Sequence, residues 1–321
     1  MKKLLILIIL LSVFAINGKA QYVSGELAKI NILPEQTVSV ILTTNETIDA
    51  ALQEAIKLYW KKCKYEFVTL DEIAGTKKIG DYIITPIDAG TSGGAAFGSS
   101  YSTTAVYTTF AKSNKEISDK VFEEYKKSKS EYGFRGAIIL NTLVNVVFDT
   151  KLLDGDLFKK AGQEILFQQA LKNAITLNIK TINWIIAADS GIKATGEMAR
   201  AMGKYNSNSC ELNKMILLVS SSDAIKRGSP YYIGKDFDLN EFKQHYKFDA
   251  KIETPEKIKE YISSDKNNKY ALLIHAFYSR SPVVLIIRLT DGAILYGKFI
   301  SSASFSGFTN RTYKQFDDVC N

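Results

Sequence analysis

Residues 38–68 read VSVILTTNETIDAALQEAIKLYWKKCKYEFV. The run from Val38 to Thr43 has the length and composition of a buried strand, and residues 65–68 alternate like a second strand. Between them, apolar side chains recur at intervals of three and four residues, which predicts an amphipathic helix: Ile48, Leu52, Ile56, Tyr59 and Cys63. Two strands joined by a crossover helix predict a parallel pair and therefore an α/β fold.

The following residues extend this pattern to a β-α-β-α-β unit. Thr69-Leu-Asp-Glu72 has the pattern of a capping box and predicts a short helix, and residues 81–86 (DYIITP) predict a third strand. The same order recurs near the C-terminus, where residues 215–219 predict a strand, residues 239–246 a short helix and residues 248–252 a second strand.

Two local likenesses connect these units. Thr254-Pro-Glu-Lys-Ile258 matches Thr69-Leu-Asp-Glu-Ile73, and each segment places a threonine at the expected N-cap of a helix. Strands that begin with a tyrosine follow, at Tyr82 and at Tyr270. The two units are either an internal duplication or a chance match in a sequence rich in lysine and isoleucine.

A hairpin signal closes the second unit. Asp291-Gly292 lies between two apolar segments, residues 283–289 and 293–298, and Asp-Gly in this context is typical of a tight hairpin turn. A hairpin adds antiparallel pairing to the parallel pairing of the crossover units. The predicted fold class is therefore α/β with mixed (α+β) sheets, built from two β-α-β-α-β units joined by a helical connector.

The segment between the units supplies an insertion and a connector. Residues 89–109 are rich in glycine, serine and threonine, residues 114–131 predict a helix with lysines and glutamates on its surface, and residues 137–148 predict an apolar strand. Helical spacing begins at Phe158. The expected organisation is a signal peptide at 1–20, a first α/β domain at 21–155, a helical connector at 156–210, and a second α/β domain with hairpin and tail at 211–321.

The N-terminus predicts export. Lys2 and Lys3 precede an apolar run from Leu4 to Ile16, and Gly18 and Ala20 provide the small residues of a cleavage site. The run is short for a membrane span, and no later stretch reaches the length that one requires. The mature chain is expected to be soluble, without a transmembrane segment, in the periplasm or on the outer surface.

Charge and cysteine content exclude several classes of protein. The formal charge of +7 includes three lysines of the predicted signal peptide, and the remaining lysines alternate with acids, so no nucleic-acid partner is predicted. Three cysteines allow at most one internal disulfide, and with two histidines no zinc site is predicted. Gly191–Glu197 has the outline of a phosphate loop, but Glu197 stands where the loop needs lysine. No cofactor is predicted.

One motif raises the alternative of a serine hydrolase. Gly90-Thr-Ser-Gly-Gly94 matches G-x-S-x-G, which in hydrolases lifts a serine onto a turn between a strand and a helix. Ser92 would then be the nucleophile, with Asp236 as the acid and His275 or His245 as the base. A glycine-rich and serine-rich loop explains the same residues without catalysis, and each histidine has a structural explanation in a strand or at a helix end.

Exposed aromatic residues beside small polar ones suggest a binding surface. The candidates are Tyr231 and Tyr232, before a glycine, and Phe305 and Phe308 in the C-terminal tail. Together with residues 89–109 they favour a non-enzymatic interaction protein of the cell envelope, which binds an envelope protein or a surface ligand.

The C-terminal third resembles a group of exported bacterial proteins. The order Leu212–Val219, Phe248–Ile252, Thr254–Ile258 and Tyr270–Ile274 is similar to small α/β modules of uncharacterised exported proteins of Bacteroidota. A looser likeness connects it to the α/β domains of envelope proteins of the curli-secretion and TolB N-terminal kind. The resemblance implies an envelope role and assigns no catalytic residues.

Overall fold

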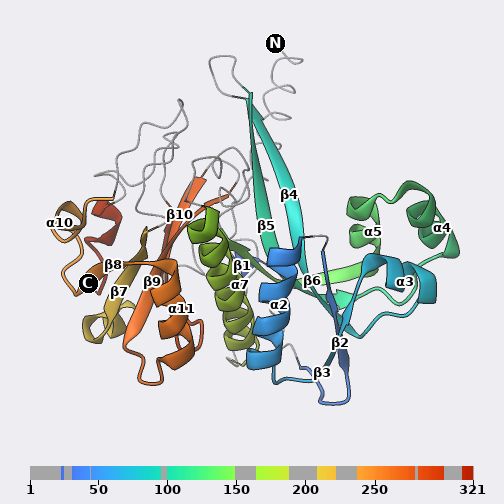
Figure 1. The fold of residues 1–321 in the computed structure, drawn as a ribbon, viewed down its shortest axis with the longest axis horizontal. Helices are drawn as coiled ribbons and strands as arrows, with labels where there is room; N and C mark the ends of the chain where they lie inside the picture. Colours follow the sequence, from blue (N-terminus) through green and yellow to red (C-terminus); the bar gives the residue numbers. More distant parts are fainter. Residues whose placement is uncertain are drawn as a thin grey trace, which may run out of the picture.

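The computed structural model describes residues 23–24, 31–43, 45–94, 100–148, 164–187, 208–221, 237–278, 281–299 and 313–320. These residues form two mixed sheets with helices on their faces, so the predicted α/β fold class is confirmed. The longest of the described helices, α7 (Glu164–Ala187), lies between the two sheets as the predicted helical connector (Figure 1). None of the described helices is long and apolar enough to cross a membrane.

The first sheet has six strands in the order β1-β6-β5-β4-β2-β3. Their bounds are Val23–Ser24 for β1, Thr37–Ile41 for β2, Lys64–Val68 for β3, Tyr82–Gly94 for β4, Ser100–Ser113 for β5 and Ile139–Phe148 for β6. Strand β2 is parallel to β3 and β4, whereas β4, β5, β6 and the two-residue β1 pair antiparallel.

The second sheet has five strands in the order β11-β10-β9-β7-β8. Their bounds are Ile216–Ser220 for β7, Ala250–Glu253 for β8, Tyr270–Tyr278 for β9, Ser281–Arg288 for β10 and Ile294–Phe299 for β11. Strand β7 is parallel to β8 and β9, and β9, β10 and β11 are antiparallel. The predicted Asp-Gly hairpin is confirmed, with Gly292 at φ +78° in the turn.

Strand order and direction are therefore the same in both units, as a duplication predicts. Hydrogen-bond register fixes the partners within each unit, and the two units are aligned at Val38 and Leu217. Val38 lies opposite Tyr65 and Tyr82, and Leu217 lies opposite Ala250 and Ala271. Counting from these pairs makes Thr69 and Thr254 equivalent. Tyr82, however, is equivalent to Ala271. Tyr82 and Tyr270, which the sequence pattern matched, therefore occupy positions that differ by one residue.

Helices cover both faces of each sheet. The first unit has α2 (Glu46–Tyr59), α3 (Leu70–Thr76), α4 (Asp119–Ser128) and α5 (Glu131–Ile138). The second has η2 (Ser209–Lys214), α10 (Leu239–Phe242), α11 (Pro255–Ser264) and η3 (Lys314–Phe316). Helices α2, α7 and α11 form a central layer between the sheets (Figure 1).

The two sheets present opposite faces to this central layer. The first sheet presents the face that carries α2, its first crossover helix, and the second presents the face that carries α11, its second crossover helix. Equivalent residues accordingly enter different cores: Val38 packs in the central core, and Leu217 packs in the outer core of the second sheet. The two units therefore share a topology but pack against the central layer with opposite faces of their sheets.

The insertion differs from its prediction. Residues 89–94 and 100–109 belong to β4 and β5, which pair from Tyr82↔Lys112 to Gly94↔Ser100. The long antiparallel ladder, with its threonine and tyrosine residues, outweighs the low strand propensity of glycine. Helix α4 begins later than predicted, and α5 was not predicted, because Gly133 and Gly136 obscure its helical pattern.

The three cysteines form one disulfide, which is the most that the sequence allows. Cys210 and Cys320 form a disulfide that joins η2 to the C-terminal segment, and Cys63 is free. The prediction that Cys63 closes the stripe of a helix is wrong, because α2 ends at Tyr59 and Trp60 is extended. Cys63 is half-buried against the central core, where burial raises the pKa of its thiol.

Candidate ligand-binding cleft

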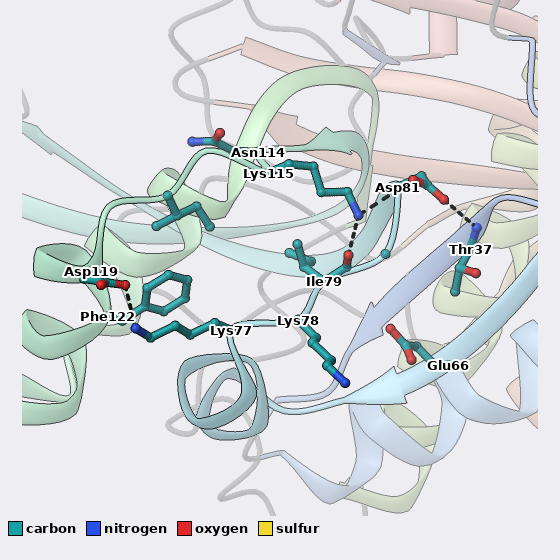
Figure 2. Close-up of a pocket in the computed structure, with 12 residues that line it drawn as sticks. Thr37, Glu66, Lys77, Lys78, Ile79, Asp81, Asn114, Lys115, Asp119 and Phe122 are labelled. Carbon is teal, nitrogen blue, oxygen red and sulfur yellow. Dashed lines mark hydrogen bonds and ion pairs between the residues drawn. The ribbon is translucent and has the colours of Figure 1, made fainter.

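A cleft of about 620 Å³ opens at the edge of the first sheet where β2 and β4 begin. It lies between the loop from α3 to β4 and the segment that follows β5 (Figure 2). Its volume falls in the range of small-molecule sites. The lining residues are Thr37, Glu66, Lys77, Lys78, Ile79, Gly80, Asp81, Asn114, Lys115, Ile117, Asp119 and Phe122.

Two backbone features shape the loop before β4. Lys77 ends α3 in the left-handed conformation, at φ 57°, and its N–H donates to the carbonyl of Ile73. Gly80 then lies directly against β2, where a Cβ atom would come within 2.6 Å of the Thr37 carbonyl oxygen. The Gly80 N–H donates to the buried Ser39 hydroxyl at 2.7 Å. Glycine is therefore required for this close approach.

Asp81 fixes the floor of the cleft. Its Oδ2 accepts a hydrogen bond from the Thr37 N–H at 2.9 Å, and its own N–H donates to the Thr37 carbonyl at 2.7 Å. Lys115 Nζ lies 3.7 Å from the other carboxylate oxygen and donates to the Ile79 carbonyl. The Ser113 hydroxyl donates to the carbonyls of Gly80 and Asp81. The floor is thus held by hydrogen bonds that join the loop before β4 to the start of β2 and the end of β5.

Helix α4 supplies the opposite wall. Lys77 Nζ lies 2.5 Å from the Asp119 carboxylate and 5.8 Å from the centre of the Phe122 ring. The hydrogen bond from Lys77 lowers the pKa of Asp119 below its ordinary value. Both partners of this ion pair are well exposed, so the contact contributes little to stability and can exchange.

Two charged side chains of the lining make no ion pair among the described residues. The Lys78 ammonium has no carboxylate within 4.0 Å, and the Glu66 carboxylate accepts a hydrogen bond only from the Ser39 hydroxyl, at 2.9 Å. Figure 2 shows Lys78 directed toward the strand that carries Glu66. Three lysines and three acids line the cleft, so its formal charge sums to zero and favours neither a polyanion nor a polycation.

The residues that line the cleft do not provide an accessible nucleophile with a base. Ser39 and Glu66 are hydrogen-bonded like a nucleophile and a base, but Ser39 is 0% exposed and already accepts from Gly80. A substrate cannot reach its hydroxyl. No group of three His, Cys, Asp or Glu side chains that could hold a metal occurs in the described part of the chain.

The predicted serine site is not supported by the backbone. Ser92 lies inside β4 opposite Ser102, so residues 90–94 form neither the turn from strand to helix that the hydrolase alternative needs nor the glycine-rich and serine-rich loop. A continuous antiparallel ladder leaves no strained elbow there. His275 lies in β9 of the other sheet, opposite Val284. Asp236 is outside the described residues.

His245 has a structural partner. It follows α10, and its Nδ1 lies 2.7 Å from Asp317 Oδ1, which ties this turn to the C-terminal segment. The predicted aromatic binding residues Tyr231, Tyr232, Phe305 and Phe308 lie outside the described residues, as does the Gly191–Glu197 segment.

Sequence reasoning missed the cleft altogether. The segment Lys77-Lys-Ile-Gly-Asp81 carries no motif, and its charges are typical of a solvated turn. The one sequence signal that draws attention to this loop is the pair of equivalent threonines. When the two units are aligned on them, the loop aligns with residues 265–270. No family model matches the chain, and neither a curated protein nor a solved structure matches it.

Proposed function

We propose that this chain is an exported, non-enzymatic binding protein of the cell envelope and that the cleft of the first unit holds its ligand. The observation that carries the proposal is a pair of charges, Lys78 and Glu66, that form no ion pair among the described residues and line a concave site of small-molecule size. A ligand with an anionic and a cationic group can form a charge-assisted hydrogen bond with each of these two side chains. The two side chains do not form such a bond with each other.

The second unit supports this choice by contrast. In the first unit, β5 leads through the cleft segment into α4 and α5 before β6 begins. In the second unit, β10 turns directly into β11 at Gly292, and no helix is inserted. Among the described residues, the inserted segment that borders the cleft thus occurs in one unit, as expected for a specialised site on a repeated scaffold.

The compartment is supported by two independent features. Residues 1–20 have the pattern of a signal peptide, and the Cys210–Cys320 disulfide is consistent with an oxidising compartment. We place the protein in the periplasm or on the outer surface on these grounds.

Native mass spectrometry tests the binding function. The mature chain, purified from the envelope fraction of the cells that produce it, should carry a small molecule that dissociates on collisional activation. Lys78→Glu should lose that adduct, because the reversed charge repels the anionic end of the ligand. Lys127→Glu makes the same charge change on the exposed surface of α4, outside the lining, and should keep it. Equal adducts on both variants, or none on the native protein, would contradict the proposal.

A further inference from the structure

The corner of the second sheet that is equivalent to the cleft already contains an ammonium group. Register makes Ser113 equivalent to Leu289 and Asn114 equivalent to Thr290. The backbone agrees, since the N–H of Ser113 donates to Asp81 and the N–H of Leu289 donates to Tyr270 in the same manner.

Lys180, from α7, occupies this second corner. Its Nζ donates to the carbonyls of Leu289 at 2.7 Å, Ile262 at 2.9 Å and Thr290 at 3.2 Å. The same Nζ lies 4.4 Å from the centre of the Tyr59 ring. Lys180 is only 4% exposed, so three carbonyls and an aromatic ring replace its hydration. The end of a second crossover helix and the turn after the antiparallel strand therefore form a receptor for a primary ammonium.

The first unit builds the same corner without a lysine from α7. The second crossover helix is α3, and the turn after the antiparallel strand contains Asn114, which lines the cleft. Lys115 contributes an ammonium at the rim, but its side chain is 51% exposed. Glu66 adds a carboxylate that the second unit lacks, because its equivalent there is Lys251. Carboxylates lie near both corners: Asp291 and Asp265 interact with Lys180, and Glu66 and Asp81 line the cleft.

We propose that the cleft binds a zwitterion, with a primary ammonium in the corner beside Glu66 and a carboxylate on Lys78. The ligand class is a free amino acid or a short peptide with free ends. This inference rests on the proposed binding function and adds the chemistry of the ligand. The zero net charge of the lining matches a ligand whose two charges also cancel.

Three related peptides separate the two charges. Triglycine has both ends free, N-acetyl-triglycine has only the carboxylate, and triglycine amide has only the ammonium. Isothermal titration of the mature chain should show triglycine binding at least about tenfold more tightly than either blocked peptide, since a charge-assisted contact contributes roughly 1.5 kcal/mol or more.

Two variants assign the charges to residues. Lys78→Met should remove the preference for triglycine over triglycine amide, and Glu66→Gln should remove the preference over N-acetyl-triglycine. Lys127→Met and Glu256→Gln, both exposed and outside the lining, should leave all three affinities unchanged. Because all four side chains are exposed, unchanged melting temperatures will show that each variant folds.

The outcomes separate this inference from the broader proposal. Equal affinity for the three peptides, or no binding of any, overturns the zwitterion. Lys78-dependent binding of N-acetyl-triglycine at the affinity of triglycine overturns the ammonium site and leaves the cleft as an anion-binding site. The adduct measured by mass spectrometry judges the binding function itself, whichever peptide result is obtained.

Discussion

The equivalent corners of the two sheets differ in what covers them. In the second unit α7 packs over the corner, and Lys180 fills it with three hydrogen bonds to carbonyls. In the first unit the corner lies on the outer face, beside α4, and remains open as a cleft. The cause is the inverted packing of the copies: the same face is inside in one unit and outside in the other. The same backbone arrangement holds Lys180 of α7 in the second unit and borders the cleft in the first.

The outer faces differ in the same sense. Regular helices cover the outer face of the first sheet, whereas short helical turns and the C-terminal segment cover that of the second. The C-terminal segment packs Tyr313 and Phe316 into the outer core and is joined to η2 by the disulfide. The second unit therefore depends on a covalent link where the first depends on helix packing.

Loss of the disulfide should give the largest effect. Cys210→Ser should lower the free energy of unfolding by about 4 kcal/mol, because the bond closes a loop of more than 100 residues in the unfolded chain. Urea unfolding under non-reducing conditions measures this. Cys63→Ser, which removes a free thiol of the first unit, should cost less than about 1.5 kcal/mol. Equal losses in the two variants would show that the covalent link does not distinguish the units.

Two glycines provide a comparison of the corners themselves. Gly292 has φ +78°, and a Cβ there would come within 2.4 Å of the Thr181 N atom on α7. We expect Gly292→Ala to cost about 3 kcal/mol, from both strain and overpacking. Gly80→Ala meets only the close contact and should cost about 1–2 kcal/mol. Urea titration decides the order, and a larger loss at Gly80 would refute it.

The buried ammonium predicts a pH dependence that the open corner cannot show. Burial lowers the pKa of Lys180 to about 8, while the nearby Asp291 and Asp265 carboxylates oppose the shift. Above pH 8 the unfolded chain therefore binds more protons at this residue than the folded protein does. The stability that Lys180 contributes should rise by about 1–2 kcal/mol between pH 8 and pH 9.5.

Lys180→Met isolates this contribution. The difference in unfolding free energy between native protein and variant should change across this pH range in the stated direction. Taking the difference removes the opposite contribution of Cys63, whose raised pKa makes unfolding easier as pH increases. A difference that stays constant from pH 8 to pH 9.5 would show that Lys180 titrates normally.

The smallest effect concerns the two equivalent helix caps. Thr69 and Glu72 form a complete capping box, with the Thr69 N–H donating to Glu72 at 2.6 Å, whereas Thr254 accepts from the Lys257 N–H and Pro255 follows it. Thr69→Ala should cost about 1 kcal/mol, and Thr254→Ala about 0.5 kcal/mol, because proline preorganises the first turn. Hydrogen exchange at the first turns measures both. The reverse order would argue against a role for the box.

Local sequence patterns predicted most of the helices and strands. The apolar run before Thr43, the capping box at Thr69 and the Asp-Gly turn predicted their elements because each depends on neighbours within a few residues. The hairpin at residues 89–109 was missed, since its strands are stabilised by pairing with each other and not by their own composition.

The sequence alone determined the β-α-β-α-β order in each unit and the two threonine caps that mark their equivalence, because periodicity and capping are local. Only the tertiary structure decided which face of each sheet is turned inward. That choice depends on the fit of α2, α7 and α11 in one shared core, which joins residues more than 100 positions apart. The same choice left the corner beside Lys78 open to solvent and placed Lys180 in its counterpart.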